Sequence, residues 1–317
     1  MQTLPNYFAA HKTPENLSNV ILKIAKVAQE IAQLLRRGAL NNILGAANHI
    51  NVQGEEQKKL DVLSNELFIN AFQNCPFVRA IASEEMESPI EITPNAPFLL
   101  LFDPLDGSSN IDINAPVGTI FSILPADNPN GFLQQGKNQI AAGYVLYSAA
   151  TEMALSLGCG TDIFLLDSDS NNFVLITEKI QIAPDTQEFA INASNQRFWL
   201  PPIARYIAEL LAGKMGARGK DFNMRWVAAM VADIHRVLHR GGVFLYPIDE
   251  KNKNKGGRLR LLYEANPMSF LITQAGGLAT TGNQAILEIV PQQLHQRVSV
   301  ILGAKNEVQY IETLFKA

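Results

Sequence analysis

The chain has few of the residues that mark several large classes of protein. Only Cys75 and Cys159 are cysteines among its 317 residues, too few for a disulfide framework and without the spacing of a metal-binding pair. No apolar run approaches the ~20 residues that span a bilayer, and the first residues lack the basic-then-apolar order of a signal peptide. We therefore expect two reduced structural thiols in a cytoplasmic protein that does not act in a membrane.

An excess of charge of one sign is also missing. The 26 basic and 30 acidic residues give a net charge of −4, which leaves no electrostatic footprint for nucleic acid or an anionic membrane. Internal repeats and low-complexity tracts are absent too. Apolar side chains are plentiful: 47% of the residues are hydrophobic, enough for a large core in one layered unit or two subdomains. Small molecules remain as the expected partners.

Local patterns predict helices before about residue 75, mainly short strands from about residue 98 to 167, and a mixture of helices and strands after that. The first helix is expected to begin with the hydroxyl of Thr13 as its cap and Pro14 at its first position. A second is expected from about Lys59 to Phe72, with Asp61 in its first turn. A composition shift near residues 183–185 predicts a boundary between subdomains 1–184 and 185–317. The other expected elements are strands over 98–102, 117–124, 140–148, 162–167, 241–247 and 297–303, helices over 202–211, 226–238 and 265–277, an exposed basic loop over 250–257 and a C-terminal helix.

The stretch FDPLDGSSN (102–110) carries the strongest chemical signal. Asp103 and Asp106 stand three positions apart, directly before a Gly-Ser-Ser turn and after an apolar run that suits a strand buried on both faces. Ligands bind at the carboxyl ends of strands in open α/β sheets, where two carboxylates can share a metal and the backbone amides of a turn can hold a phosphate. The same residue types are common in ordinary turns, so a structural turn is the alternative.

Three further acidic positions fall at element junctions. Glu84 and Glu85 follow the apolar run 78–82, although alone they could form an exposed acidic loop. Glu264 ends an apolar run just before a predicted helix, where the helix dipole alone could favour an acid. Together with Asp61 and the FDPLDGSSN acids, they form a set of hard oxygen ligands that favours Mg²⁺ or Mn²⁺ over Zn²⁺. A two- or three-metal site for phosphate-ester hydrolysis needs such a set.

These motifs together resemble class 1 fructose-1,6-bisphosphatases over nearly the whole chain. DPLDGSS indicates the lithium-sensitive phosphatase superfamily that includes inositol monophosphatases. LRLLYEANPM (259–268) and MVADIHR (230–236) narrow the resemblance to the fructose bisphosphatases within that superfamily. The family implies an α/β fold, a layered α/β/α/β/α sandwich, and a homotetramer. It also implies hydrolysis of the 1-phosphate of fructose 1,6-bisphosphate in gluconeogenesis and sugar-phosphate metabolism, with two or three Mg²⁺ per subunit and Mn²⁺ as a possible substitute.

The resemblance also implies roles for individual residues. The metal ligands would be Glu84, Glu85, Asp103, the carbonyl of Leu105, Asp106 and Glu264. The catalytic residues would be Asp61 and Glu85, which orient and deprotonate the attacking water, and Arg260 near the 1-phosphate. The 1-phosphate would bind at Asp106, Gly107, Ser108 and Ser109. The rest of the substrate would contact Asn192, Trp226, Met230, Phe244, Leu245, Tyr246, Arg258, and Arg225 reaching from a neighbouring subunit.

Two segments have structural interpretations that compete with these roles. Arg225 and Trp226 could equally form a surface cation–π pair. MVADIHR could simply be a helix with Met230 in the core, and we expect His235 within it to be structural.

Three departures from the family pattern fall on the sugar side. Arg258 stands where the family usually has lysine, 192–194 reads Asn-Ala-Ser where it often reads Asn-Glu-Gly, and Trp226 replaces a common tyrosine. A planar guanidinium cannot reproduce the contacts of an ammonium, and an indole N–H donates without accepting. A sedoheptulose-1,7-bisphosphatase or a dual enzyme is therefore the nearest alternative. A non-catalytic regulatory homologue is the rival from another class, although every metal acid is intact.

The regulatory site of the animal members departs further. They bind AMP through a Lys-Tyr pair, a Thr-Gly-Glu turn and an arginine, whereas the matching places here read Pro97-Phe98, residues 28–30 (Ala-Gln-Glu) and Pro125. Both phosphate-seeking cations are gone, so we expect AMP to inhibit weakly or not at all in that mode. Inhibition at low micromolar AMP would contradict this expectation. The redox-regulatory cysteine loop of chloroplast members is also absent from the sequence.

Overall fold

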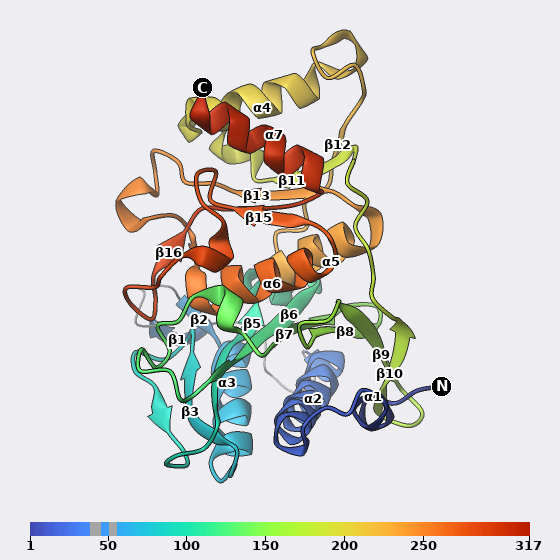
Figure 1. The fold of residues 1–317 in the computed structure, drawn as a ribbon, viewed down its shortest axis with the longest axis vertical. Helices are drawn as coiled ribbons and strands as arrows, with labels where there is room; N and C mark the ends of the chain where they lie inside the picture. Colours follow the sequence, from blue (N-terminus) through green and yellow to red (C-terminus); the bar gives the residue numbers. More distant parts are fainter. Residues whose placement is uncertain (39–45, 51–55) are drawn as a thin grey trace.

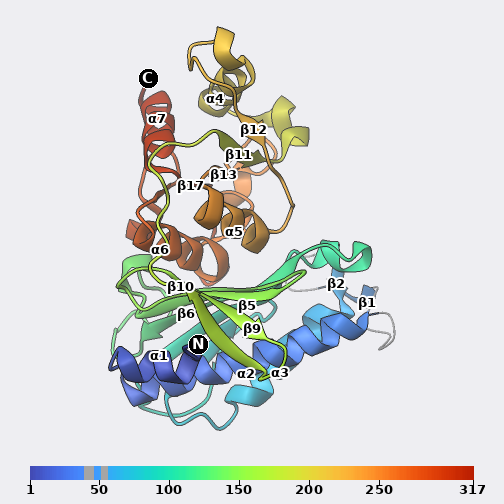
Figure 2. The same cartoon turned by 90° about the vertical axis from the view of Figure 1, so that its right-hand side faces the viewer.

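The computed structural model describes residues 1–38, 46–50 and 56–317, which form alternating layers of helices and sheets (Figure 1). The first layer consists of α1 (Leu4–Ala10), α2 (Glu15–Arg37) and α3 (Lys59–Phe72). These helices pack on one face of an eight-stranded sheet (Figure 2). Its strands are β3 (Val78–Ser83), β4 (Ile90–Glu91), β5 (Phe98–Asp106), β6 (Val117–Pro125), β7 (Ala141–Tyr147), β8 (Thr151–Ser156), β9 (Asp162–Asp167) and β10 (Asn172–Thr177).

The second half of the chain supplies the remaining layers. Helices α5 (Met230–Arg240) and α6 (Asn266–Gln274) lie between the eight-stranded sheet and a second sheet (Figure 2). Helices α4 (Pro201–Leu211) and α7 (Lys305–Lys316) cover the outer face of that second sheet. The strands of the second sheet are β11 (Glu188–Ile191), β12 (Asn223–Met224), β13 (Val243–Tyr246), β15 (Leu278–Thr280) and β17 (Val300–Gly303). The expected α/β/α/β/α sandwich is confirmed.

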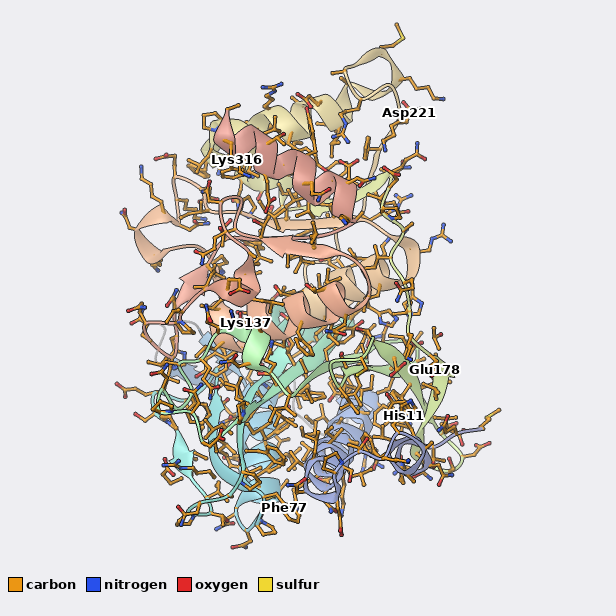
Figure 3. All side chains as sticks on the ribbon, in the orientation of Figure 1. His11, Phe77, Lys137, Glu178, Asp221 and Lys316 are labelled. Carbon is orange, nitrogen blue, oxygen red and sulfur yellow. The ribbon has the colours of Figure 1, made fainter. Side chains whose placement is uncertain are left out.

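Two short ribbons complete the described secondary structure. One pairs β1 (Ala46–Ile50) with β2 (Glu56–Lys58), and the other pairs β14 (Leu259–Arg260) with β16 (Arg297–Val298). Among the described helices, none has the length and apolar character needed to cross a membrane. Charged side chains such as Glu178, Asp221 and Lys316 lie on the outside of the molecule (Figure 3).

The burial of β5 on both faces follows from these layers. Phe102 stacks on Phe68 of α3, with ring centroids 4.4 Å apart, while Leu99 and Leu101 face the opposite side of the sheet. A strand sandwiched between two layers must be apolar at successive positions rather than at alternate ones. The prediction of a strand buried on both faces at 98–102 is therefore confirmed.

The expectation that the motif follows a strand of an open α/β sheet needs correction. β5 runs parallel to β3, but the other adjacent pairs among the described strands of this sheet are antiparallel. Asp103 and Asp106 also lie inside β5 rather than after it, because pairing with β6 resumes at Asp106 beyond an irregularity. Continuous hydrophobicity indicated burial but did not specify the direction of the neighbouring strands.

Four element boundaries also differ from the predictions. The first long helix begins at Glu15 with Pro14 as its N-cap residue, and Thr13 does not cap it. The helix expected from Trp226 begins only at Met230. The run 297–303 divides between β16 and β17. The run ending at Glu264 is a short strand followed by a π-helical turn, Leu261–Ala265.

Several other elements match their predictions. The helices at 59–72 and 202–211, the strands at 117–124 and 162–167, and the C-terminal helix are confirmed within about a residue at most ends. Sequence reasoning missed α1, β8 and β10. Both cysteines are free, as expected, but only Cys75 is buried, so a structural role for the exposed Cys159 is not supported.

Candidate active site

The parallel pair β3 and β5 brings two of the acidic clusters together. Ser83 pairs with Phe102, and the backbone N–H of Glu84 donates to the carbonyl of Phe102 at 3.0 Å, which continues the ladder by one residue. Both strands therefore end at the same edge of the sheet. Glu84 and Glu85 consequently emerge beside Asp103, although they precede it by 19 and 18 positions in the chain.

Glu264 joins these acids from the π-helical turn at 261–265. The extra residue in such a turn changes the direction of the side chain relative to a regular helix. The carboxylate of Glu264 accepts a hydrogen bond from the backbone N–H of Arg260 at 2.5 Å. One oxygen each from Asp103, Asp106 and Glu264 lies within 4.8 Å of the others, so the three can share a cation.

Burial and mutual repulsion make this cluster difficult to ionise without a cation. Burial first, and then the charge of Glu84, raises the pKa of Asp103 well above its usual range. Burial and the charge of Glu264 raise the pKa of Asp106 to about 7, although the backbone N–H groups of Val231 and Met230 oppose the shift. The N–H of Val231 donates to Asp106 Oδ2 at 2.8 Å.

Arg260 supplies positive charge within the cluster. Arg260 is 7% exposed as a residue, and its guanidinium forms an ion pair with Glu84 and lies 3.8 Å from Glu264. One guanidinium does not balance Glu84, Asp103, Asp106 and Glu264 together. A donor set of crowded, buried carboxylate oxygens therefore fits hard divalent cations of the Mg²⁺ class.

Asp61 approaches the cluster from the first turn of α3. Asp61 is 3% exposed as a residue, and its carboxylate accepts a hydrogen bond from the backbone N–H of Lys58 at 2.8 Å. Burial raises the pKa of Asp61 to about 7, against the lowering effect of that N–H, and the nearby charge of Glu85 raises it further. Glu85 and the Ser108 side chain thus lie close enough to Asp61 to affect its pKa.

The turn after β5 has the shape that the sequence predicts for a phosphate site. Gly107 has a φ of +79°, and a Cβ there would meet the Cβ of Ala229 at 2.6 Å, so a larger residue would have to displace its neighbour. A 3₁₀ helix, Ser108–Ile113, follows at once. Its first N–H groups have no acceptor within the helix and can therefore face a ligand.

A cavity of about 330 Å³ connects the acid cluster to this turn and to the second sheet. Most residues that the family resemblance assigned to metal or substrate line it. They are Glu84, Glu85, Asp103, Leu105, Asp106, Gly107, Ser108, Ser109, Asn192, Trp226, Met230, Phe244, Tyr246, Arg258, Arg260 and Glu264.

Three aromatic side chains also line the cavity. The indole of Trp226 stacks on Phe244 with ring centroids 6.0 Å apart and an interplanar angle of 8°. The ring of Tyr246 lies 6.1 Å from the same indole. Trp226 therefore faces the cavity and packs on aromatic rings, which differs from the surface cation–π pair with Arg225 that the sequence left open.

Two of the expected substrate residues do not line this cavity. Leu245 belongs to the outer core under α4 and α7, because adjacent residues of β13 face opposite sides of the sheet. Arg225 is exposed and lines a small hollow beside Glu188 and Arg236. Because Arg225 lies outside the cavity of its own chain, it could bind substrate in the cavity of a neighbouring subunit. That role stays a prediction.

Sequence reasoning missed several lining residues, of which Asp233 is the most informative. Ala228, Ala229 and Leu259 also line the cavity. Asp233 Oδ1 accepts a hydrogen bond from the backbone N–H of Val227 at 3.0 Å. Burial raises the pKa of Asp233 to about 7, although N–H groups of Val227 and Ala228 lower it. The available signal was an acid within the predicted helix 226–238; the structure places it in the first turn of α5, because that helix begins at Met230.

Three comparisons place these features among known proteins. Models of the N-terminal and C-terminal domains of fructose-1-6-bisphosphatase match residues 5–178 and 182–316. A class 1 fructose-1,6-bisphosphatase of Acinetobacter baumannii (strain SDF) is 59% identical over 303 residues, covering 94% of both chains. Another from Shewanella sp. (strain MR-7) is 54% identical over 312 residues, covering 97% of this chain and 94% of its own.

A solved structure agrees with these sequence matches. The crystal structure of Leishmania major fructose-1,6-bisphosphatase in holo form is 33% identical and covers 99% of both chains, with a TM-score of 0.94. The layered fold and the acidic cavity are thus accompanied by sequence matches along the whole length. The chain belongs to the class 1 fructose-1,6-bisphosphatase family.

Proposed function

We propose that this protein is a metal-dependent phosphoric monoester hydrolase of carbohydrate metabolism that removes the 1-phosphate of fructose 1,6-bisphosphate. The products are fructose 6-phosphate and phosphate. The observation that carries the proposal is the single cavity that joins the buried carboxylates to the Gly107–Ser109 turn. Class 1 fructose-1,6-bisphosphatases at 59% identity over nearly the whole chain support the choice of substrate.

The chain's own residues would hold the metal ions and activate the attacking water. Glu84, Glu85, Asp103, Asp106, Glu264 and the carbonyl of Leu105 would hold the metal ions. Such ions, when bound, supply Lewis-acid stabilisation of phosphoryl charge and activate water. Asp61 and Glu85 orient the water and take its proton, and the pKa of about 7 makes Asp61 an effective base near neutral pH.

The phosphoryl group that is transferred to water would be held by backbone and guanidinium donors. The Ser108 and Ser109 amides at the start of the 3₁₀ helix would donate to the anion, and Arg260, which also lines the cavity, would add a positive charge. Arg258 and Asn192 lie further along the cavity, beside Tyr246, where the second phosphate of a sugar bisphosphate would sit. Trp226 and Met230 line the same cavity and would contact the sugar between the two phosphates.

The proposal extends to the metal ion, the oligomeric state and the subdomain boundary. We propose Mg²⁺ as the physiological ion, two or three per subunit, because the donors are hard oxygens; Mn²⁺ has similar preferences. We also propose a cytoplasmic homotetramer, in keeping with the family resemblance, in which a shared Arg225 would require at least two subunits, and a subdomain boundary near residue 184.

Phosphate release from a panel of substrates tests the proposal. The purified chain would be incubated with fructose 1,6-bisphosphate, sedoheptulose 1,7-bisphosphate and inositol monophosphate, with Mg²⁺ and separately with Mn²⁺. We expect the largest kcat/KM on fructose 1,6-bisphosphate. A larger value on the seven-carbon sugar would favour a sedoheptulose bisphosphatase, because Arg258, Trp226 and residues 192–194 all depart from the family on the sugar side. No release from any substrate at saturating metal would favour a regulatory homologue.

A further inference from the structure

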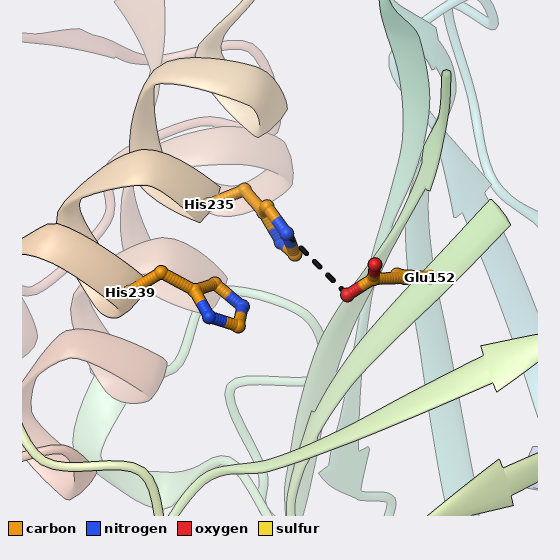
Figure 4. Close-up of side chains that lie close together, drawn as sticks. All are labelled: Glu152, His235 and His239. Carbon is orange, nitrogen blue, oxygen red and sulfur yellow. Dashed lines mark ion pairs between the residues drawn. The ribbon is translucent and has the colours of Figure 1, made fainter. Parts of the chain in front are cut away.

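A second cluster of metal-ligating side chains lies away from the carboxylate cavity. His235 and His239 are four residues apart on α5, so they lie on one face of the helix. Glu152 of β8 faces them from the eight-stranded sheet (Figure 4). None of the three lines the cavity of the proposed active site. The proposed hydrolysis uses none of them.

The geometry of the three side chains suits a shared ion. Glu152 Oε2 lies 3.5 Å from His235 Nε2, and the two imidazole centroids are 4.4 Å apart. One ligand atom from each residue lies within 4.8 Å of the others. Bonds of about 2 Å in a tetrahedral site separate two ligands by roughly 3.3 Å, so small side-chain rotations would complete the coordination.

A buried hydroxyl already orients one of the imidazoles. The hydroxyl of Tyr144 lies 2.9 Å from His235 Nδ1, and the Tyr144 side chain has no exposed surface. This contact leaves Nε2 of His235 directed at Glu152, as the dashed line in Figure 4 shows. In metal sites, a ligating histidine nearly always has its second ring nitrogen held by such a partner.

The donor types select a different ion from that of the active site. We propose that Glu152, His235 and His239 form a second cation site, which binds a transition ion of the Zn²⁺ class and leaves a fourth position for water. Two imidazoles and one carboxylate suit Zn²⁺, Cu²⁺ or Ni²⁺, whereas Mg²⁺ prefers oxygen donors alone. His239 is exposed and the other two side chains are 17% and 22% exposed, so an ion can enter from solvent.

An ion at this place would connect two layers of the fold. α5 begins beside the active site, where the N–H of Val231 holds Asp106 and Met230 lines the cavity. Its later turn carries His235 and His239 opposite β8. The ion therefore fastens α5 to the eight-stranded sheet, and by mass action it stabilises the folded protein by an amount that grows with the logarithm of its concentration relative to Kd.

Cu²⁺ is a suitable probe because its paramagnetic spectrum reports nitrogen ligands. The full-length protein would be titrated with Cu²⁺ in excess Mg²⁺, which competes for the oxygen-donor cavity. We expect nitrogen hyperfine coupling from two imidazoles. The variant His239→Gln should lose one nitrogen coupling and bind at least ten times more weakly, whereas His11→Gln, which removes an exposed histidine near the N-terminus, should match the wild type (Figure 3).

Zn²⁺ affinity measured by competition with a chromophoric chelator provides the second readout. Glu152→Gln should weaken Zn²⁺ binding at least tenfold, and Tyr144→Phe should weaken it about tenfold through the lost orientation of His235. Zn²⁺ should also raise the Tm of the wild type but not that of His239→Gln. Affinity and Tm shift that are the same in the wild type, His239→Gln and Glu152→Gln would overturn the site.

Discussion

Asp61 and Glu85 come from different elements, α3 and the end of β3, and Asp61 does not itself line the cavity, yet the two carboxylates lie close enough for the charge of Glu85 to raise the pKa of Asp61. Burial and the charge of Glu85 raise the pKa of Asp61 to about 7, so this carboxyl can take up a proton near neutral pH. At this scale, function depends on how burial and a nearby like charge set the pKa of one buried acid.

Neutralising either residue of this pair should reduce turnover. In Asp61→Asn and Glu85→Gln, the side chain still fits but can no longer accept a proton. We expect kcat on fructose 1,6-bisphosphate to fall about 10²- to 10⁴-fold, the range for general-base catalysis. Steady-state kinetics would measure this fall. Glu87→Gln, at an exposed position of the same segment, serves as the matched control, and full activity in Asp61→Asn would show that the assignment of the base is wrong.

Asp61 should also make the metal-free protein sensitive to pH. Because burial raises its folded-state pKa to about 7, the native state binds the proton more tightly than the unfolded chain does. That contribution to the free energy of unfolding is complete below about pH 4 and is lost as the pH rises towards 7.

Denaturant unfolding in a chelating buffer at pH 5 and pH 8 would measure this effect. Asp61→Asn cannot ionise, so its stability relative to the wild type should increase with pH by on the order of 2 kcal/mol. A difference that stays constant across this pH range would contradict the account.

At the scale of elements, the ends of β3 and β5 and the π-helical turn at 261–265 form the acid cluster. The sequence predicted the strands, because continuous apolar runs are typical of buried strands. It could not predict that β3 and β5 are parallel neighbours in an otherwise antiparallel sheet, since pairing depends on contacts distant in sequence. The π-helical turn was also missed, because the apolar pattern of 259–263 suits a strand equally well.

More of the candidate site than of the strand pairing could be predicted from the sequence. Motif spacing and family resemblance identified most of the residues that line the cavity. They did not identify Asp233, whose importance lies in hydrogen bonds to a loop, nor the orientation of Leu245, which depends on the register of β13. The start of α5 was placed too early because the apolar residues 226–229 continue a helical pattern, although Ala228 has a φ of +68°.

The conformation of the loop before α5 should depend on the hydrogen bond that Asp233 accepts from Val227. In Asp233→Ala, the N–H of Val227 loses its acceptor, which should cost about 1–3 kcal/mol of stability. Trp226 would then be held less firmly against Phe244, so we expect KM for the sugar bisphosphate to rise more than kcat falls. Kinetics and thermal unfolding would measure both effects, with the exposed Asp169→Ala as control. A fall in kcat with an unchanged KM would argue for direct participation of Asp233 in the chemistry.

At the scale of the whole molecule, the position of Arg225 outside its own cavity matters most. If a neighbouring subunit uses this guanidinium, Arg225→Ala should raise KM several-fold, while Arg197→Ala, at another exposed arginine, should not. Mixed oligomers of Arg225→Ala and Asp103→Asn subunits should regain activity, because some cavities would combine intact acids with an intact arginine. Activity equal to the sum of the separate variants would contradict sharing between subunits.

The most direct test of the central claim follows the atoms of the reaction. Fructose 1,6-bisphosphate would be hydrolysed in ¹⁸O-labelled water with Mg²⁺, and the products would be observed by ³¹P NMR and mass spectrometry. The account predicts loss of the 1-phosphate signal, retention of the 6-phosphate signal, and one labelled oxygen in the released phosphate. Label in the sugar, release of the 6-phosphate, or unchanged hydrolysis when the metal is chelated would contradict it.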